Sequence, residues 1–244
     1  WLTVNDDNSL DLTSEGTIAL WVKADTTTQE DYAGLVSKSD DGGDGGACTP
    51  GGISYSLYWR EYGGVNIISG LLCDGSSSNS VNIPEFDTNW HHLVFMWNSS
   101  YASIYKDGVV ASSKANSISP QISTESLRIG GDCFGIDDGD AGEFDGKIDD
   151  VMIFNRGLSA DQIYILYQNR TDEIVSSETT RGENWTVIVY PNDGYEDGIG
   201  VMSNNITILN TEPVIDSLIL NATSSGNTTS DNLTAHATTS DADS

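Results

Sequence analysis

Hydrophobic and polar residues alternate over short runs along most of the first 157 residues. In the run TIALWVKA at 17–24, Ile18, Leu20 and Val22 fall on one face of a predicted strand. The run WHHLVFMW at 90–97 is apolar on both faces, as expected of a central strand in a sandwich. Further strands are predicted within residues 32–38, 53–60, 65–73, 102–113, 126–132 and 146–155. Many short strands without a long helical pattern predict an all-β fold.

Two local signals predict where the chain turns and where it becomes helical. KDGV at 106–109 carries the Asp-Gly pair of a type I′ hairpin turn, in which both central residues need a positive φ. LSADQIYILYQ at 158–168 predicts one short helix, with Ser159 as N-cap and Gln162 completing a capping box. Ile163, Leu166 and Tyr167 share one face of that helix, so we expect it to dock on the sandwich.

The amino-acid composition changes after about residue 170. Residues 184–198 and 204–210 are strand-like, and residues 212–244 hold two further β segments in a Ser-, Thr- and Asn-rich setting. We therefore predict two domains, 1–168 and 169–244, of which the second is another β module. The chain opens on Trp1 rather than Met, which leads us to expect a segment excised from a longer precursor.

The formal net charge of −27 restricts the classes of partner. The ten Lys and Arg residues are scattered singly, so no basic patch could neutralise phosphates, and nucleic acid is an unfavourable partner. An anionic membrane surface would repel the chain, and no apolar run is long enough for insertion of this segment into a membrane. Asp outnumbers Glu by 26 to 11, and Asp in glycine-rich loops is a common oxygen ligand of Ca²⁺.

Potential glycosylation sites favour an extracellular or cell-surface location. The seven N-x-S/T sequons are Asn98, Asn169, Asn184, Asn205, Asn221, Asn227 and Asn232. Most of them follow residue 168, where the composition is typical of a stalk. In such an oxidising setting one disulfide is expected among the three cysteines. Cys48 and Cys73 flank a hairpin and are the slightly preferred pair, with Cys133 as the competing partner.

An ordered set of motifs resembles a laminin-G-like domain of the concanavalin A-like kind over residues 1–168. The motifs are SLDLTSEGTIALWVKAD, LVSK, YSLY, NWHHLVFMWNSSYASIYKDGVVASS, LRIGG and FDGKIDDVMIFNRGLSADQIYILY. The resemblance implies a two-sheet antiparallel jelly-roll sandwich, here with one short C-terminal helix. It also implies carbohydrate or protein binding in secreted and surface proteins, often with Ca²⁺. The family usually begins with one more strand before the position of Trp1.

The C-terminal region resembles Ig-like or cadherin-like repeats of prokaryotic, especially archaeal, surface proteins. Residues 183–210 resemble the second half of such a repeat, and residues 213–244 resemble the first half of the next. Each half would then need strands from outside this segment, from upstream sequence or by strand exchange with a neighbouring subunit.

Calcium is the cofactor that the acidic loops favour, in a structural role. The glycine-rich loop SKSDDGGDGGACT and the loop DCFGIDDGDAGEFDGKIDD combine carboxylates with carbonyls that could turn inward. In jelly-roll relatives an Asp at the start of the last strand often ligates Ca²⁺, and KIDDV matches that position. The predicted ligands are Asp40, Asp41, Asp44, Asp137, Asp138, Asp140, Glu143 and Asp149. A solvated acidic surface remains the alternative for each cluster.

The sequence favours no catalytic residues. Jelly-roll glucanases carry E-x-D-x-x-E, whereas EFDGKID offers Glu143 and Asp145 but has Ile148 at the third position. On strand geometry Asp149 should share a face with Val151 and Ile153 while Asp150 points the opposite way, which excludes a dyad.

His91 and His92 are neighbours on a predicted strand and so face opposite ways, which makes a shared zinc site improbable. Sugar binding would need exposed aromatic side chains beside hydrogen-bonding groups. The predicted ligand-binding residues are Tyr58, Arg60 and Tyr62, with Trp59 and Trp97 as further candidates that core packing could equally claim.

The leading functional hypothesis is a non-enzymatic extracellular module that acts in adhesion or in surface or filament architecture, with neighbouring protein subunits as partners. A Ca²⁺-dependent carbohydrate-binding module that recognises surface glycans is the alternative. A glycoside hydrolase is a minor alternative.

Overall fold

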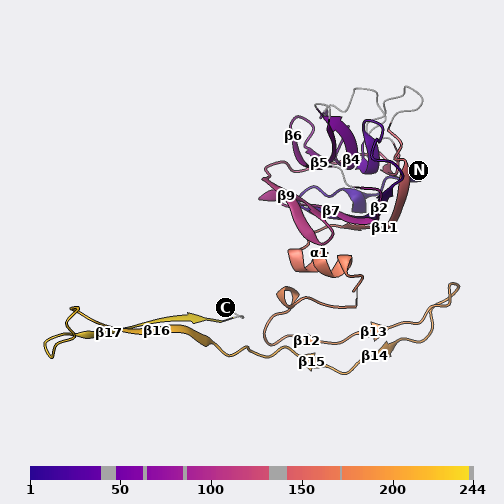
Figure 1. Cartoon of the computed structure of the whole chain (residues 1–244). Coiled ribbons are helices and arrows are strands. Elements are labelled where there is room, and N and C mark those ends of the chain that lie inside the picture. Colours follow the sequence, from indigo (N-terminus) through magenta and orange to yellow (C-terminus); the bar gives the residue numbers. More distant parts are fainter. Residues whose placement is uncertain (40–47, 63–64, 85–86, 132–141, 171, 242–244) are drawn as a thin grey trace. The chain divides into compact units, whose positions relative to one another are not determined.

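The chain divides into two compact units, Trp1–Glu173 and Ile174–Ser244 (Figure 1). A computed structural model describes residues 1–39, 48–62, 65–84, 87–131, 142–170 and 172–241, with Glu61 and Tyr62 described in their backbone alone. The domain boundary predicted after residue 168 lies inside the first unit. The short connection that follows the helix, with an ion pair between Arg170 and Glu173, belongs to that unit as well.

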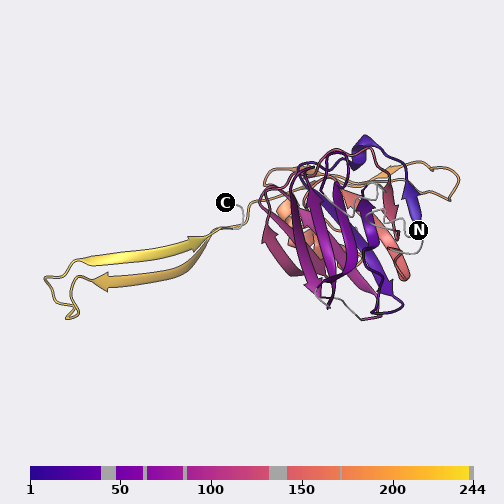
Figure 2. The ribbon, with the colours of Figure 1, turned by 90° about the horizontal axis from the view of Figure 1, so that it is seen from above.

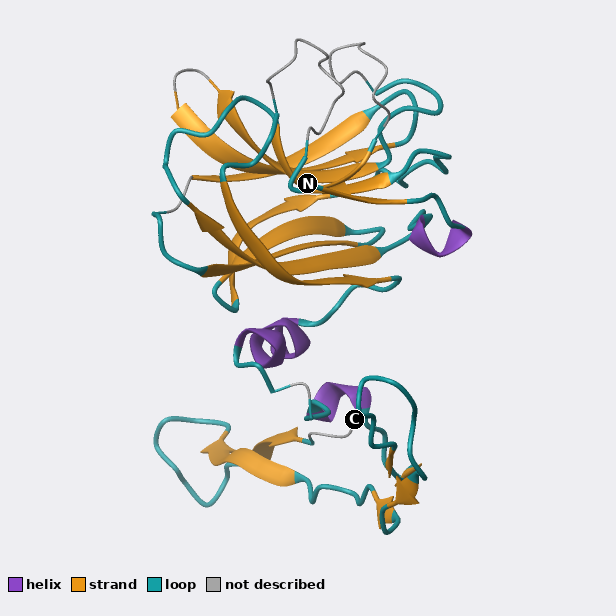
Figure 3. Cartoon of the chain, turned by 90° about the vertical axis from the view of Figure 1, so that its right-hand side faces the viewer, coloured by secondary structure: helices purple, strands orange, loops and turns teal. Residues whose placement is uncertain are grey.

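Two antiparallel sheets form the first unit, and Figure 3 shows them stacked face to face. In the described residues the first sheet has the order β1 (Leu2–Val4), β10 (Leu127–Ile129), β3 (Ala33–Lys38), β4 (Tyr55–Tyr62), β5 (Val65–Cys73) and β6 (Ser78–Pro84). The second has the order β11 (Gly146–Phe154), β2 (Gly16–Ala24), β7 (His91–Trp97), β8 (Tyr101–Lys106) and β9 (Val109–Ala115). A short 3₁₀ helix, η1 (Asn8–Leu10), precedes β2. The predicted all-β sandwich is confirmed.

The main core lies between the two sheets. Ile18, Leu20 and Val22 all point into it from β2, as the alternating pattern predicts. The central strand β7 is buried on both faces, as its sequence predicts. Its residues Leu93, Phe95 and Trp97 belong to the main core, and Val94 and Met96 pack on the opposite face.

The helix α1 (Ala160–Tyr167) covers the outer face of the five-stranded sheet (Figure 1). Ser159 and Gln162 make the capping box that the sequence predicts, and Ile163 is buried against that sheet. The β8–β9 turn reaches the helix at Gly108, where a Cβ would lie 2.9 Å from ring atoms of Tyr164 and Tyr167. Asp107 and Gly108 have φ of 52° and 80°, the positive values that a type I′ turn requires.

The strand β11 contains a bulge that changes which face its acidic residues occupy. Its register on β2 shifts between Asp149 and Met152, and Asp150 has a φ of 48°. Asp149 is paired with Trp21, whereas Val151 and Ile153 pack against the core between the sheets. The expectation that Asp149 shares a face with Val151 and Ile153 is therefore wrong. The extra residue of a bulge breaks the strict alternation on which it rested.

The described residues of the second unit form two-stranded ribbons and one short 3₁₀ helix, η2 (Ser176–Glu178). The strand pairs are β12 (Asn184–Trp185) with β15 (Ile206–Thr207), β13 (Ile188–Val189) with β14 (Val201–Met202), and β16 (Val214–Ala222) with β17 (Leu233–Ser240). Figure 2 shows the β16–β17 ribbon. Between residues 174 and 241 the only buried side chain described is that of Val175. The Ig-like repeats therefore stay a prediction.

None of the described helices is long and apolar enough to cross a membrane.

Candidate functional site

The outer face of the six-stranded sheet, which points away from the core, combines hydroxyl, amide, guanidinium and aromatic groups. Strand register and alternation place these side chains in adjacent rows. The first row is Arg128, Ser37, Ser56, Leu71 and Ser80, the second includes Tyr58, Ser69 and Asn82, and the third begins with Arg60 and Ile67. None of these outward-facing strand residues, among those described, carries a carboxylate. Since the chain as a whole has a net charge of −27, this lack of carboxylates distinguishes the face from the rest of the sequence.

Two hydrogen-bonded groups of polar side chains lie on this face. The Ser37 hydroxyl is 2.7 Å from the hydroxyls of both Ser39 and Ser56, and all three residues are buried. Closer to the sheet edge, the Ser69 hydroxyl donates to the Asn82 side-chain oxygen at 2.7 Å. Asn82 is exposed, so the polar surface reaches solvent on β6.

A small apolar cluster lies beside these polar groups. Its members, called the Tyr32 cluster below, are Tyr32, Cys48, Ile53, Tyr58, Leu71 and Cys73. The rings of Tyr32 and Tyr58 are 6.0 Å apart, with Tyr58 buried and Tyr32 half-buried above it. Tyr32 has a φ of 65°, a left-handed conformation that is unfavourable for a bulky residue. Such conformations gather at functional sites, which makes Tyr32 a candidate for ligand contact.

The turn that carries Tyr32 is held by Gln29. The buried Gln29 amide donates to the carbonyl oxygens of Thr26 and Asp145, both at 2.9 Å, and accepts from the Asp145 backbone N–H at 2.8 Å. The sequence did not single out Gln29 or Tyr32. A lone glutamine in a polar loop carries no pattern, and Tyr32 reads as the first residue of a strand rather than as a turn residue.

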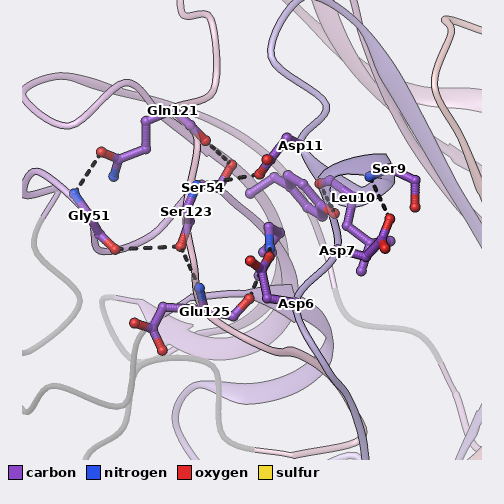
Figure 4. Close-up of polar contacts among 12 residues, drawn as sticks. Asp6, Asp7, Ser9, Leu10, Asp11, Gly51, Ser54, Gln121, Ser123 and Glu125 are labelled. Atoms are coloured by element: carbon purple, nitrogen blue, oxygen red, sulfur yellow. Dashed lines mark hydrogen bonds and ion pairs between the residues drawn. The ribbon is translucent and has the colours of Figure 1, made fainter.

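A disulfide and one glutamine fix the loop at residues 48–54, which forms one wall of the Tyr32 cluster. Cys48 and Cys73 are joined, with Cα atoms 5.6 Å apart, and this is the pairing preferred from the sequence. The Gln121 amide donates to the carbonyl oxygens of Thr49 and Ile53 at 2.8 and 2.7 Å. Its side-chain oxygen accepts from the Gly51 backbone N–H at 2.9 Å (Figure 4). Cys133 lies outside the described residues.

The N-terminal segment is joined to the end of β3 by an ion pair between Asp6 and the buried Lys38. The Lys38 side chain is 0% exposed, and its ammonium lies 2.5 Å from a carboxylate oxygen of Asp6. The same ammonium donates to the Glu125 carbonyl oxygen at 2.9 Å. Figure 4 shows Asp6 and Glu125 together with the Ser123 hydroxyl, which accepts from the Glu125 backbone. The buried Tyr55 hydroxyl donates to the Leu10 carbonyl oxygen, and its burial raises the Tyr55 pKa.

The structure brings part of the predicted ligand-binding set together. Tyr58 and Arg60 lie two residues apart on β4, on the outer face. Tyr58 is 2% exposed and Arg60 is half-buried, while the side chain of Tyr62 lies outside the description. The further candidates Trp59 and Trp97 are fully buried in the main core, so neither is available to a ligand.

The acidic residues predicted to bind calcium are described only in part. Asp40, Asp41, Asp44, Asp137, Asp138 and Asp140 lie outside the described residues. Glu143 and Asp149 are exposed, and the Asp149 carboxylate accepts from the Asp150 backbone N–H at 2.9 Å. Within the described ranges, no three His, Cys, Asp or Glu side chains are placed to hold a metal ion. The calcium site stays a prediction.

The two adjacent histidines occupy opposite faces of β7. His91 lies between carboxylates, with its Nδ1 2.8 Å from Asp107 and its Nε2 3.1 Å from Asp87. His92 is buried beneath α1, with its ring centroid 5.3 Å from that of Trp21 and 6.1 Å from that of Tyr167. Burial lowers the pKa of His92 to about 4, although the Asp107 carboxylate acts in the opposite direction.

The first unit is expected to lose about 2 kcal/mol of unfolding free energy as the pH falls from about 6.5 to about 4. The His92 pKa is depressed in the folded state, so the unfolded chain binds this proton first and is stabilised as the pH falls. Urea unfolding at several pH values would measure the effect. In His92→Phe, which keeps a ring between Trp21 and Tyr167, the unfolding free energy should fall by about 2 kcal/mol less over this pH range than that of the wild type. Equal losses of unfolding free energy in the two proteins would contradict the assignment to His92.

The chain belongs to the concanavalin A-like lectin/glucanases superfamily, whose laminin-G profile matches residues 1–164. Two solved structures illustrate the likeness of the fold. One is domain 4 of an extracellular arabinanase from Geobacillus stearothermophilus, solved in complex with arabinotriose. It is 19% identical, with a TM-score of 0.48, and the match covers 68% of this chain and 71% of the arabinanase domain. The other is a pentraxin from Limulus polyphemus, with 15% identity, a TM-score of 0.47, and coverage of 64% and 70%. No curated protein sequence matches the chain.

Proposed function

We propose that the first unit is a non-catalytic carbohydrate-binding module that uses the outer face of its six-stranded sheet. The observation that carries the proposal is the chemistry of this face, where tyrosine, arginine, serine and asparagine side chains occupy adjacent positions and the described strand residues supply no carboxylate. Glycosidases need a pair of carboxyl groups across the scissile bond. Binding requires only an apolar platform and a few polar groups that set orientation.

Each group in the proposed site has a definite task. The half-buried ring of Tyr32, supported from below by Tyr58, offers a platform for the C–H face of a sugar ring. The guanidinium of Arg60 offers several donors in a planar fork, and the exposed amide of Asn82 offers both a donor and an acceptor. Gln29 acts as a positioning residue, because it holds the turn in which Tyr32 takes its left-handed conformation.

The proposed setting is the outside of a cell, where the module would support adhesion. A disulfide persists best in an oxidising compartment, and all seven sequon asparagines are described and are half-buried or exposed. Calcium would serve a structural role, with ligands drawn from the two acidic loops at 40–44 and 137–143. Oxygen-rich loops of this composition suit Ca²⁺.

A glycan array probed with the full chain, with and without EDTA, tests the function and the role of calcium. Glycan binding that persists in EDTA would remove calcium from the proposal. If no glycan is bound either with or without EDTA, adhesion through protein contacts would be left as the function. The array's best glycan then serves as the titration ligand. Release of reducing sugar from it at high protein concentration would overturn the non-catalytic assignment.

Tyr32→Ala is expected to raise the Kd for that glycan about tenfold, the range of a central aromatic contact. Tyr101→Ala is the matched control, since Tyr101 is a partly exposed tyrosine on β8 of the other sheet. Its Kd should stay within about twofold of the wild type. Equal losses in the two variants, or none in either, would place the binding site elsewhere.

A further inference from the structure

The β16–β17 hairpin of the second unit has two chemically different faces. Side chains of cross-strand partners share a face, and the register pairs Leu218 with Ala237, Leu220 with Ala235 and Ala222 with Leu233. One face is therefore apolar along these three pairs. The opposite face carries Ser217 with Thr238, Ile219 with His236 and Asn221 with Thr234.

The bulge in β16 extends the apolar face and keeps its one carboxylate away. The register shifts between Ile215 and Ser217, so Ile215, paired with Thr239, falls on the apolar side. Asp216, the only charged residue in either strand, accepts a hydrogen bond from the Ser240 hydroxyl at 2.8 Å. Ser240 lies on the polar side, because it is two residues from Thr238. The apolar face consequently presents no charge.

The large side chains of this face are uncovered. Ile215, Leu218, Leu220 and Leu233 are 62%, 67%, 63% and 66% exposed. An isolated two-stranded hairpin is at best marginally stable in water, so a further layer is needed to keep it folded. The face spans about 27 Å along eight residues, and covering it would bury about 500 Å² per partner, near the lower limit for a specific interface.

The far end of the hairpin is locked by its own side chains, which fixes the shape of the face. The Asp231 carboxylate accepts from the hydroxyls of Thr223 and Ser224 at 2.9 and 2.8 Å, and from the backbone and hydroxyl of Thr228 at 2.6 and 3.1 Å. These bonds also lower the pKa of Asp231, the Ser224 bond most strongly. A preorganised face loses less entropy on association than a flexible one.

We infer that the apolar face of β16–β17 pairs two copies of this chain, face to face, as a four-stranded sandwich. The occupant is a second copy because the face complements itself. Leu218 and Leu220 of β16 stand beside Ala235 and Ala237 of β17, so a two-fold arrangement sets large residues of one copy against small residues of the other. A partner chosen by charge would find nothing to bind on this face.

The polar face is compatible with this pairing. The sequon residue Asn221 lies on it, so a glycan there would point away from the apolar contact. Pairing would also join two first units in one assembly. Two linked carbohydrate-binding modules gain avidity for a surface that carries many copies of one glycan.

Sedimentation of the full chain over a range of concentrations up to about 0.5 mM tests the pairing, with an expected dimer Kd on the order of 10 µM. Leu220→Gln should raise that Kd at least about tenfold. Ile219→Gln is the matched control, since Ile219 is the adjacent residue, is 54% exposed and lies on the polar face. It should change the Kd by less than about twofold. Equal effects of the two substitutions would overturn the assignment of the face.

Hydrogen exchange on the same samples locates the contact and guards against a variant that merely unfolds. Amides of residues 214–240 should become more protected as the wild type dimerises, while those of β2 stay unchanged. A dimer without this protection, a monomer throughout, or a hairpin protected equally at all concentrations would each overturn the pairing. Raising NaCl from about 0.05 M to about 0.5 M should lower the Kd, because salt screens repulsion between two acidic chains. A Kd that rises with salt would mean that ion pairs hold the dimer instead.

Discussion

Asp6→Ala is expected to lower the free energy of unfolding of the first unit by about 3 kcal/mol. The substitution removes the carboxylate 2.5 Å from the Lys38 ammonium and leaves that ammonium in a side chain with no exposed surface. The remaining bond from Lys38 to the Glu125 carbonyl oxygen is neutral on its acceptor side and compensates only in part. Urea unfolding followed by the fluorescence of the buried Trp59 and Trp97 would measure the loss.

Asp7→Ala is the matched control for this prediction. Asp7 is the neighbouring carboxylate, but it is exposed and only caps the short helix η1, through a 2.9 Å bond from the Ser9 backbone. Its loss should cost much less than the loss of Asp6, because the cap bond lies in solvent and no buried charge is left unpaired. Lys38→Met added to Asp6→Ala should recover most of the stability, because the unpaired charge is gone. Equal costs for Asp6→Ala and Asp7→Ala would show that the ion pair has no special weight.

The fold of the first unit is predictable because its strands and helix are specified by local patterns. Alternation in β2 and two-sided burial in β7 follow from which positions are apolar, and both are observed. The capping box of Ser159 and Gln162 likewise involves residues only three positions apart. The Asp-Gly pair at 107–108 sets its own turn through backbone conformation.

Features that depend on contacts between distant segments were not predictable. The bulge at Asp150 arises from the register of β11 on β2, which no local pattern contains. A sequence reading also places a lysine such as Lys38 at the surface, because its burial depends on Asp6, which is 32 residues away. In the candidate site, Tyr58 and Arg60 followed from the pattern of one strand. Tyr32 and Gln29 did not, since their positions depend on bonds to Asp145, 116 residues from Gln29.

Removing the disulfide with Cys48→Ser and Cys73→Ala is expected to cost about 3 kcal/mol of unfolding free energy. The bond closes a loop with a sequence separation of 25, and opening it releases the entropy of that loop in the unfolded chain. In a unit of this size the loss corresponds to a decrease in Tm of about 10 °C. The disulfide-free variant and the parent with which it is compared should both carry Cys133→Ser, so that the third thiol cannot exchange with the Cys48–Cys73 pair.

The same substitutions should weaken carbohydrate binding, which distinguishes a local role for the disulfide from a purely global one. Cys48 and Cys73 belong to the Tyr32 cluster, so without the bond the loop at 48–54 loses its covalent link to β5 and the wall beside Tyr58 loosens. Titration well below the lowered Tm should therefore show a higher Kd than in the Cys133→Ser parent. Asp6→Ala, which costs a similar free energy outside the cluster, is the comparison: its Kd should remain near that of the parent. A rise in Kd of the same size in both would mean that stability alone controls binding.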